Sequence, residues 1–174
     1  MTPAVTAPPA PTVEPTAFRA IMAEFPTCVT VVTSPAAEGP VGCTANAIMS
    51  LSLDPPSIVV SLSSTGRTVN RVQDAGLFGV NLLNWSQREL TRRFATGEPC
   101  RRFDGLPYRP QLGVPVLPDA AANLVCALDR SVELHDHVLL IGRVVWTAVS
   151  GDSPALVFHR NAQHPLEPGP GAPR

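Results

Sequence analysis

Short stretches of apolar and β-branched residues recur along most of the chain, and their lengths and spacing are typical of strands. We predict about seven of them, at 28–33, 41–53, 57–62, 77–83, 121–134, 138–149 and 155–159. Three other segments show helical spacing or a helix cap and predict short helices, at 16–25, 67–75 and 86–94. Residues 96–118 are rich in Pro and Gly and predict a loop.

The short connections between these strands favour antiparallel pairing. We therefore expect a mainly β fold, a closed or split β-barrel with short flanking helices, rather than a doubly wound parallel sheet. Pro-rich segments lie at both ends. Because such segments bury little apolar surface, we expect flexible tails at 1–15 and 165–174 around one domain at 16–164.

The charged residues exclude several kinds of chemistry. All 13 cationic residues are Arg, so no Lys is present for a Schiff base or a P-loop. A bound phosphate would have to be held by Arg or by backbone N–H groups. The net charge is −1, and the sequence contains no dense run of basic residues, which argues against a nucleic-acid partner. No apolar run is long enough to cross a membrane, so we expect a cytoplasmic protein.

The four cysteines, Cys28, Cys43, Cys100 and Cys126, stand at long and irregular intervals. Neither a metal-ligand spacing nor a C-x-x-C redox pair occurs. We expect free thiols in a reducing compartment and no metal site.

One predicted strand carries an unusual number of hydrogen-bonding side chains among small residues. Residues 42–52 combine Thr44, Asn46, Ser50 and Ser52 with Gly and Ala. Small residues would let a flat ring such as a flavin isoalloxazine approach the backbone, and the polar groups could read its edge. An exposed strand face with ordinary polar alternation explains the pattern equally well.

A hydroxyl-rich loop follows the next strand and opens a helix. Residues 61–68 (SLSSTGRT) could bind a phosphate with the N–H groups of that helix and with Arg67, although a helix cap in a solvated loop would look the same. His135, Asp136 and His137 form a polar tip between two long strands; two His without a third ligand are a weak metal signal, but one His could contact a cofactor. No G-x-G-x-x-G occurs, so NADH or NADPH would bind shallowly over a flavin already in place.

Taken together, these motifs resemble the flavin reductase-like, FMN-binding split-barrel family, whose members are reductase partners of two-component flavin-dependent monooxygenases. The matching runs cover residues 17–160 and are FPTCVTVVT, GCTANAIMSLSLDPP, SIVVSL, SSTGRT, LFGVNLLNWSQRELTRRFA, LHDHVLLIGRV and ALVFHR. The resemblance implies an antiparallel split β-barrel that forms a homodimer, with FAD or FMN bound near the subunit interface.

The resemblance also implies roles for individual residues. The isoalloxazine would contact Thr44, Ala45 and Asn46, with Ser50 and Ser52 nearby, and His137 would face the nicotinamide. The ribityl chain and phosphate would lie against Ser61, Leu62, Ser63, Arg67 and Thr68, close to Arg93, Phe94 and Ala95. His159 and Arg160 match the His-Arg of the family's last strand, but here Asn161 follows where Gly is usual.

The implied reaction is hydride transfer from NADH or NADPH to FAD or FMN, after which reduced flavin diffuses to a partner monooxygenase. It needs stacking and orientation from the protein but no general base. Two alternatives remain open at this point. One is a flavin-binding electron carrier that does not oxidise NAD(P)H, and the other is a barrel that binds a different small molecule or only a protein.

Overall fold

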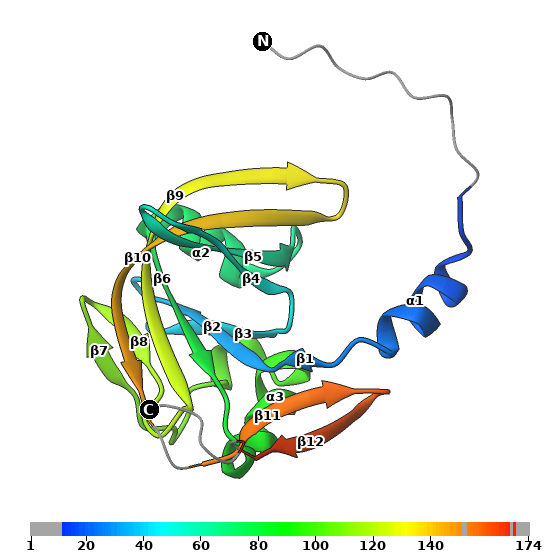
Figure 1. Ribbon diagram of the computed structural model, residues 1–174. Coiled ribbons are helices and arrows are strands. Elements are labelled where there is room, and N and C mark those ends of the chain that lie inside the picture. Colours follow the sequence, from blue (N-terminus) through cyan, green and yellow to red (C-terminus); the bar gives the residue numbers. More distant parts are fainter. Residues whose placement is uncertain (1–11, 151–152, 168, 170–174) are drawn as a thin grey trace, which may run out of the picture.

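The β-branched runs of the sequence form strands in the computed structural model, which describes residues 12–150, 153–167 and 169 (Figure 1). Three α-helices and two 3₁₀ turns accompany them: α1 (Pro15–Ala23), α2 (Arg67–Ala75), α3 (Arg88–Thr96), η1 (Trp85–Gln87) and η2 (Pro99–Arg101). The strands are β1 (Thr27–Cys28), β2 (Thr30–Ser34), β3 (Val41–Ala45), β4 (Ile48–Leu53), β5 (Pro56–Ser63), β6 (Leu77–Leu82), β7 (Arg109–Gln111), β8 (Val114–Val116), β9 (Ala122–Leu134), β10 (His137–Val149), β11 (Ala155–His159) and β12 (Ala162–Leu166).

Seven of these strands make one antiparallel sheet in the order β3-β2-β6-β9-β10-β5-β4. Its two edge strands, β3 and β4, follow one another in the chain. Only Asn46 and Ala47 separate them, and the N–H of Ser61 in β5 donates to the carbonyl of Ala47 at 2.9 Å, which extends the β4–β5 ladder to this junction. The sheet therefore curves round until its edges approach each other, as expected for the predicted antiparallel split barrel.

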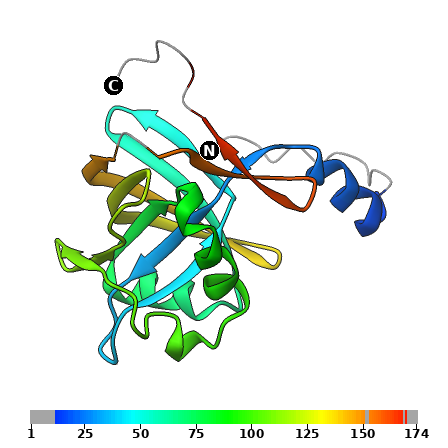
Figure 2. The ribbon, with the colours of Figure 1, turned by 90° about the horizontal axis from the view of Figure 1, so that it is seen from below.

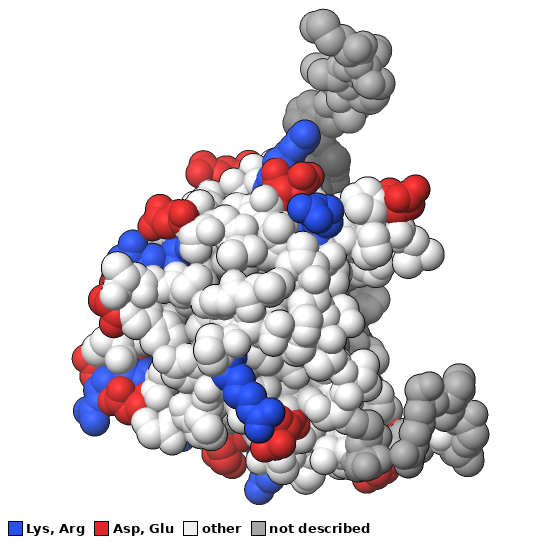
Figure 3. Space-filling view, turned by 90° about the vertical axis from the view of Figure 1, so that its left-hand side faces the viewer, with Lys and Arg blue, Asp and Glu red and all other residues white. Residues whose placement is uncertain are grey.

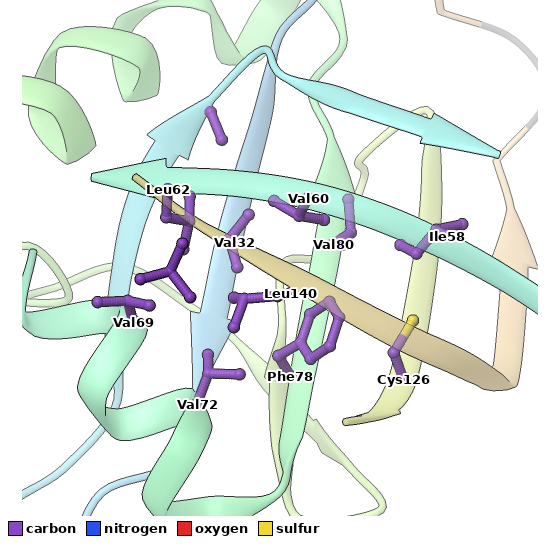
Figure 4. Packing of buried hydrophobic residues seen from close by; sticks show 12 residues of the cluster. Val32, Ile58, Val60, Leu62, Val69, Val72, Phe78, Val80, Cys126 and Leu140 are labelled. Atoms are coloured by element: carbon purple, nitrogen blue, oxygen red, sulfur yellow. The ribbon is translucent and has the colours of Figure 1, made fainter. Parts of the chain in front are cut away.

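The apolar faces of the strands and of α2 meet inside this curved sheet (Figure 4). Val32, Phe78 and Leu140 are fully buried there. Gly142 of β10 lies directly against Phe78, since a Cβ at this position would come within 2.4 Å of the ring carbon Cζ. Close packing of this kind fixes how β10 lies over β6.

The single strand predicted at 41–53 is wrong, because the chain breaks at Asn46 and Ala47 and passes from one edge of the sheet to the other. The loop predicted at 96–118 also contains structure, namely η2 and the β7–β8 hairpin. Leu112 and Gly113 form its turn with φ of 52° and 82°. Positive φ at both central residues is the geometry that suits a two-residue hairpin, and Gly supplies one of them without strain.

A second such turn closes the chain's last hairpin, β11–β12, which pairs with β1 in a separate three-stranded sheet. Arg160 and Asn161 occupy its two central positions with φ of 50° and 60°, so Asn161 takes a conformation that Asn tolerates better than most residues. β12 continues to Leu166, two residues beyond the expected domain boundary, and its Pro165 is acceptable because an edge strand needs no N–H there. The expected tails otherwise fall largely outside the described residues.

A buried amide network joins the sheet to the loop before β9. Asn81 donates from Nδ2 to the carbonyl of Val31 at 2.9 Å, and its Oδ1 accepts from the N–H of Leu117 at 2.8 Å and from Asn123 at 2.9 Å. Both Asn side chains are almost completely buried. Such fully satisfied networks hold a loop in one position.

Helix α1 lies to one side of the barrel in both ribbon views (Figures 1 and 2). None of its residues is buried, and Phe18, Ile21 and Met22 are 59%, 62% and 45% exposed. It is tied to the β11–β12 hairpin by an ion pair between Glu24, just past the helix, and Arg160 (2.7 Å).

Elsewhere, positive and negative side chains are interspersed on the face that Figure 3 presents, mostly around its margin. Of the helices in the described part of the chain, none has the length and apolar character needed to span a bilayer.

Candidate functional site

A cavity of about 530 Å³ opens where β3, the end of β5, the start of α2 and the α3–η2 segment meet. Cofactor sites commonly have volumes in this range. Eleven of the residues singled out in the sequence line it: Thr44, Ala45, Asn46, Ser61, Leu62, Ser63, Arg67, Thr68, Phe94, Ala95 and His137. Motifs far apart in the chain thus converge on one space.

Strand β3 forms one wall of the cavity. It pairs on one side with β2 and, as an edge strand of the described sheet, has no strand on its other side. The Thr44 hydroxyl donates to the carbonyl of Thr91 in α3 at 2.7 Å, so this side chain holds α3 against the strand. Gly42 permits the close approach, because a Cβ there would lie 3.0 Å from the Phe94 ring.

The opposite end of the cavity is suited to an anion. Helix α2 begins at Arg67 after Gly66, and the first N–H groups of a helix lack partners within the helix. The helix dipole and these free N–H groups together favour a negatively charged ligand at the start of α2. The hydroxyls of Ser63 and Thr65 lie 3.0 Å apart beside this turn. Arg67 and Arg102 both line the cavity, whereas no Asp or Glu does among the described residues.

His137 lies at the rim, at the first position of β10 and opposite Ser63 of β5. Its Nδ1 is 2.9 Å from a carboxylate oxygen of Asp136, and this hydrogen bond is the main reason why the pKa of Asp136 is lowered. The carbonyl of Asp136 accepts from the N–H of Ser64 at 3.0 Å. The β9–β10 tip is thereby fastened to the hydroxyl-rich loop, and His137 is held beside it.

Five residues that the resemblance placed near the flavin lie outside this cavity: Ser50, Ser52, Arg93, His159 and Arg160. The two serines belong to β4, which the break in the chain carries to the other edge of the sheet, and the Ser52 hydroxyl bonds to Asp54 instead. Arg93 donates to the carbonyls of Asp104 and Arg101. Arg160 is engaged with Glu24 through two hydrogen bonds of 2.9 and 2.7 Å.

Five further lining residues belong to the motifs at 42–52 and 61–68 singled out in the sequence: Gly42, Cys43, Ala47, Thr65 and Gly66. The sequence interpretation did not select the remaining four, Val41, Val69, Pro99 and Arg102. Burial raises the pKa of the Cys43 thiol, so this side chain stays neutral. Arg102 comes from the segment predicted as a featureless loop. No local pattern marks it, because its place in the site depends on how η2 folds back onto β3.

These features fit a phosphorylated, planar cofactor. An edge strand with small side chains offers main-chain groups to a flat ring, and the start of α2 together with two guanidinium groups offers a site for a phosphate. The resemblance noted in the sequence implies a flavin as this cofactor.

Comparisons with known proteins agree. The flavin reductase-like domain matches residues 22–167. The NADH-dependent flavin reductase StyB of Pseudomonas fluorescens is 39% identical over 136 residues, which are 76% of this chain and 77% of that protein. HsaB of Mycobacterium tuberculosis, the reductase subunit of a flavin-dependent monooxygenase, is 30% identical over 159 residues, covering 90% of this chain and 84% of that one.

Solved structures give the same result. The NADH:FAD oxidoreductase SgcE6 of Streptomyces globisporus, in complex with NAD and FAD fragments, superposes with a TM-score of 0.82 at 29% identity, covering 94% of this chain and all of that one. The chain spans only 45% and 60% of the length of two Rhizobium meliloti relatives, a probable flavin reductase and a stachydrine N-demethylase reductase subunit. The chain belongs to the flavin reductase-like family, a family of oxidoreductases, and the predicted fold is confirmed.

Proposed function

We propose that this chain is an NAD(P)H-dependent flavin reductase that holds FAD or FMN in the cavity along β3 and α2. The main support for the proposal is that one cavity is lined both by the unpaired edge of β3 and by the start of α2, where N–H groups favour an anion. When bound, the flavin supplies the redox chemistry by accepting a hydride from the nicotinamide. Relatives named as NADH-dependent flavin reductases support NADH as the donor.

The chain's own residues bind and orient. Ala45 and Asn46 would lie along the ring, with the Thr44 hydroxyl already committed to α3. The start of α2 would hold the phosphate. His137, fixed by Asp136 at the rim, would position the nicotinamide over the ring. Orientation of two bound reactants is itself a large contribution to rate.

We further propose that the reduced flavin leaves for a flavin-dependent monooxygenase. Support comes from relatives named as reductase subunits of such enzymes, HsaB among them. A cavity that opens to solvent beside an exposed rim residue, His137, suits release of the product.

We also propose that the chain forms a homodimer through α1 and β4. The helix exposes Phe18 and Ile21, and β4 exposes Met49, Leu51 and Leu53, which is 88% exposed. Exposed apolar side chains of this number mark an interface, and a second copy is the occupant implied by the family resemblance.

Light scattering after size exclusion should give a dimer. Ile21→Ser should shift it toward monomer, whereas Leu112→Asn on the opposite hairpin should not, and a monomeric parent would refute the interface.

The activity is tested by mixing the purified chain with FAD or FMN and with NADH or NADPH, and following the loss of nicotinamide absorbance. We expect rapid oxidation that depends on added flavin, and the four pairings will identify both preferred cofactors. Flavin binding without oxidation in any pairing would instead support a flavin-binding electron carrier.

A further inference from the structure

Arg102 makes an unusual set of contacts at the anion-binding end of the cavity. Its Nε donates to the carbonyl of Gly97 at 3.0 Å, Nη1 to that of Gly42 at 2.7 Å, and Nη2 to that of Ala95 at 3.4 Å. One guanidinium group thus joins the end of α3 and the segment after it to β3, the strand that forms the wall of the cavity.

These contacts satisfy N–H groups but leave the positive charge without an ionic partner. Arg102 takes part in none of the ion pairs found within the described residues, and its three acceptors are neutral carbonyls. Burial lowers the pKa of Arg102, and the nearby positive charge of Arg67 lowers it further. A guanidinium stays protonated under such conditions, so the cavity holds a charge that an anionic ligand would stabilise.

The neighbouring groups point to the same ligand chemistry. Arg67 begins α2, a helix of nine residues, and it lines the same cavity as Arg102. Its own ion pair with Glu38 is long, at 3.8 Å, and both side chains are about half exposed. Glu38 is bound more closely by Arg71, at 2.6 Å. Two cations and a helix start therefore face one cavity whose described lining contains no acid.

We propose that Arg102 is a specificity-determining residue that makes the cavity prefer flavins carrying a phosphate over riboflavin. It acts by placing a second positive charge at the phosphate end, where its contacts with the carbonyls of Gly97, Gly42 and Ala95 hold the guanidinium in position. This inference rests on the proposed function, since it requires that the cavity binds a flavin.

The test is a set of equilibrium titrations of the full chain with FMN and with riboflavin, followed by flavin fluorescence. The parent should bind FMN at least about tenfold more tightly than riboflavin, the factor expected from one charged hydrogen bond or more. Arg102→Met should weaken FMN binding about tenfold and riboflavin binding less than about twofold. Arg102→Lys keeps the charge and should retain most of the preference even if both affinities fall.

Arg101→Met is the matched control, because Arg101 is the adjacent residue, 72% exposed and paired with Asp104 at 3.3 Å outside the cavity. It should leave the FMN-to-riboflavin ratio unchanged. The salt dependence of FMN binding should become shallower in Arg102→Met but not in Arg101→Met, since screening weakens charge–charge contacts.

Three results would overturn the inference while leaving flavin binding intact. They are a parent that binds riboflavin as tightly as FMN, an Arg102→Met variant that loses both ligands equally, and one that loses neither. Equal losses would mean that Arg102 only holds the segment in place. A parent that binds neither flavin would refute the proposed function itself, and this inference with it.

Discussion

Gly142 offers a sharp test of how the barrel is packed. A Cβ at this position would lie 2.4 Å from Cζ and 2.7 Å from Cε1 of Phe78, and 2.8 Å from the Cβ of Cys126. Carbon atoms in contact normally lie about 3.5–4.0 Å apart. Phe78 and Cys126 are both fully buried, so neither can move away without disturbing the core. Gly142→Ala should therefore cost about 1–3 kcal/mol of unfolding free energy, the usual range for overpacking.

The assay is urea denaturation followed by tryptophan fluorescence. For a domain of this size the same cost lowers Tm by about 2–12 °C. Phe78→Leu in the Gly142→Ala background should recover part of the loss, because the shorter side chain removes the contact, and the double-mutant cycle should show coupling of about 0.5 kcal/mol or more. Gly169→Ala, where a Cβ meets nothing within 4 Å, is the control. A cost below about 0.5 kcal/mol, or strictly additive effects, would refute this packing.

Three further predictions concern the cofactor site, the network and a buried thiol. His137→Ala should raise the KM for NADH about five- to tenfold, the worth of about one hydrogen bond, while changing flavin affinity little. His135→Asn, on the same turn with φ of 56°, is the control, and a KM in His137→Ala equal to that of the parent would contradict the role. Asn81→Leu should lower the free energy of unfolding by about 2 kcal/mol or more in thermal or urea unfolding, because the N–H of Leu117 and the carbonyl of Val31 lose their hydrogen-bond partner. Asn70→Leu, on the exposed side of α2, is the control and should be nearly neutral. Burial raises the pKa of Cys126 to about 12 from an ordinary 9.0. Between these pH values the unfolded chain releases a proton that the folded chain keeps, so the free energy of unfolding falls as pH rises. Cys126→Ala should flatten this slope, and an unchanged slope would contradict the raised pKa.

Much of the barrel could be predicted from the sequence because its strands are rich in β-branched residues and separated by Pro and Gly. The break between β3 and β4 could not, since neither Gly nor Pro stands at it and Asn46, a common turn residue, has strand-like residues on both sides. The break follows from closure of the sheet, which requires the chain to change edges. Likewise the β7–β8 hairpin was hidden by its prolines, which are tolerated because this hairpin is a separate two-stranded sheet in which both strands are edge strands.

The candidate site, like the fold, could be predicted only in part. Residues within one motif, such as Thr44 to Asn46 or Ser61 to Thr68, were recognisable because their residue types and order are distinctive, and the fold brings them together in one cavity. Arg102 was not recognisable, since its position depends on contacts with residues as distant in sequence as Gly42. Arg160 matched a family pattern, yet in this chain its guanidinium is engaged with Glu24.

The most direct test of the central claim is a crystal structure of the chain with FMN bound. We expect the ring to lie along β3 beside Ala45 and Asn46, with the phosphate at the start of α2 near Arg67 and Arg102. A flavin bound elsewhere on the chain, or one whose phosphate points away from α2 into solvent, would contradict it.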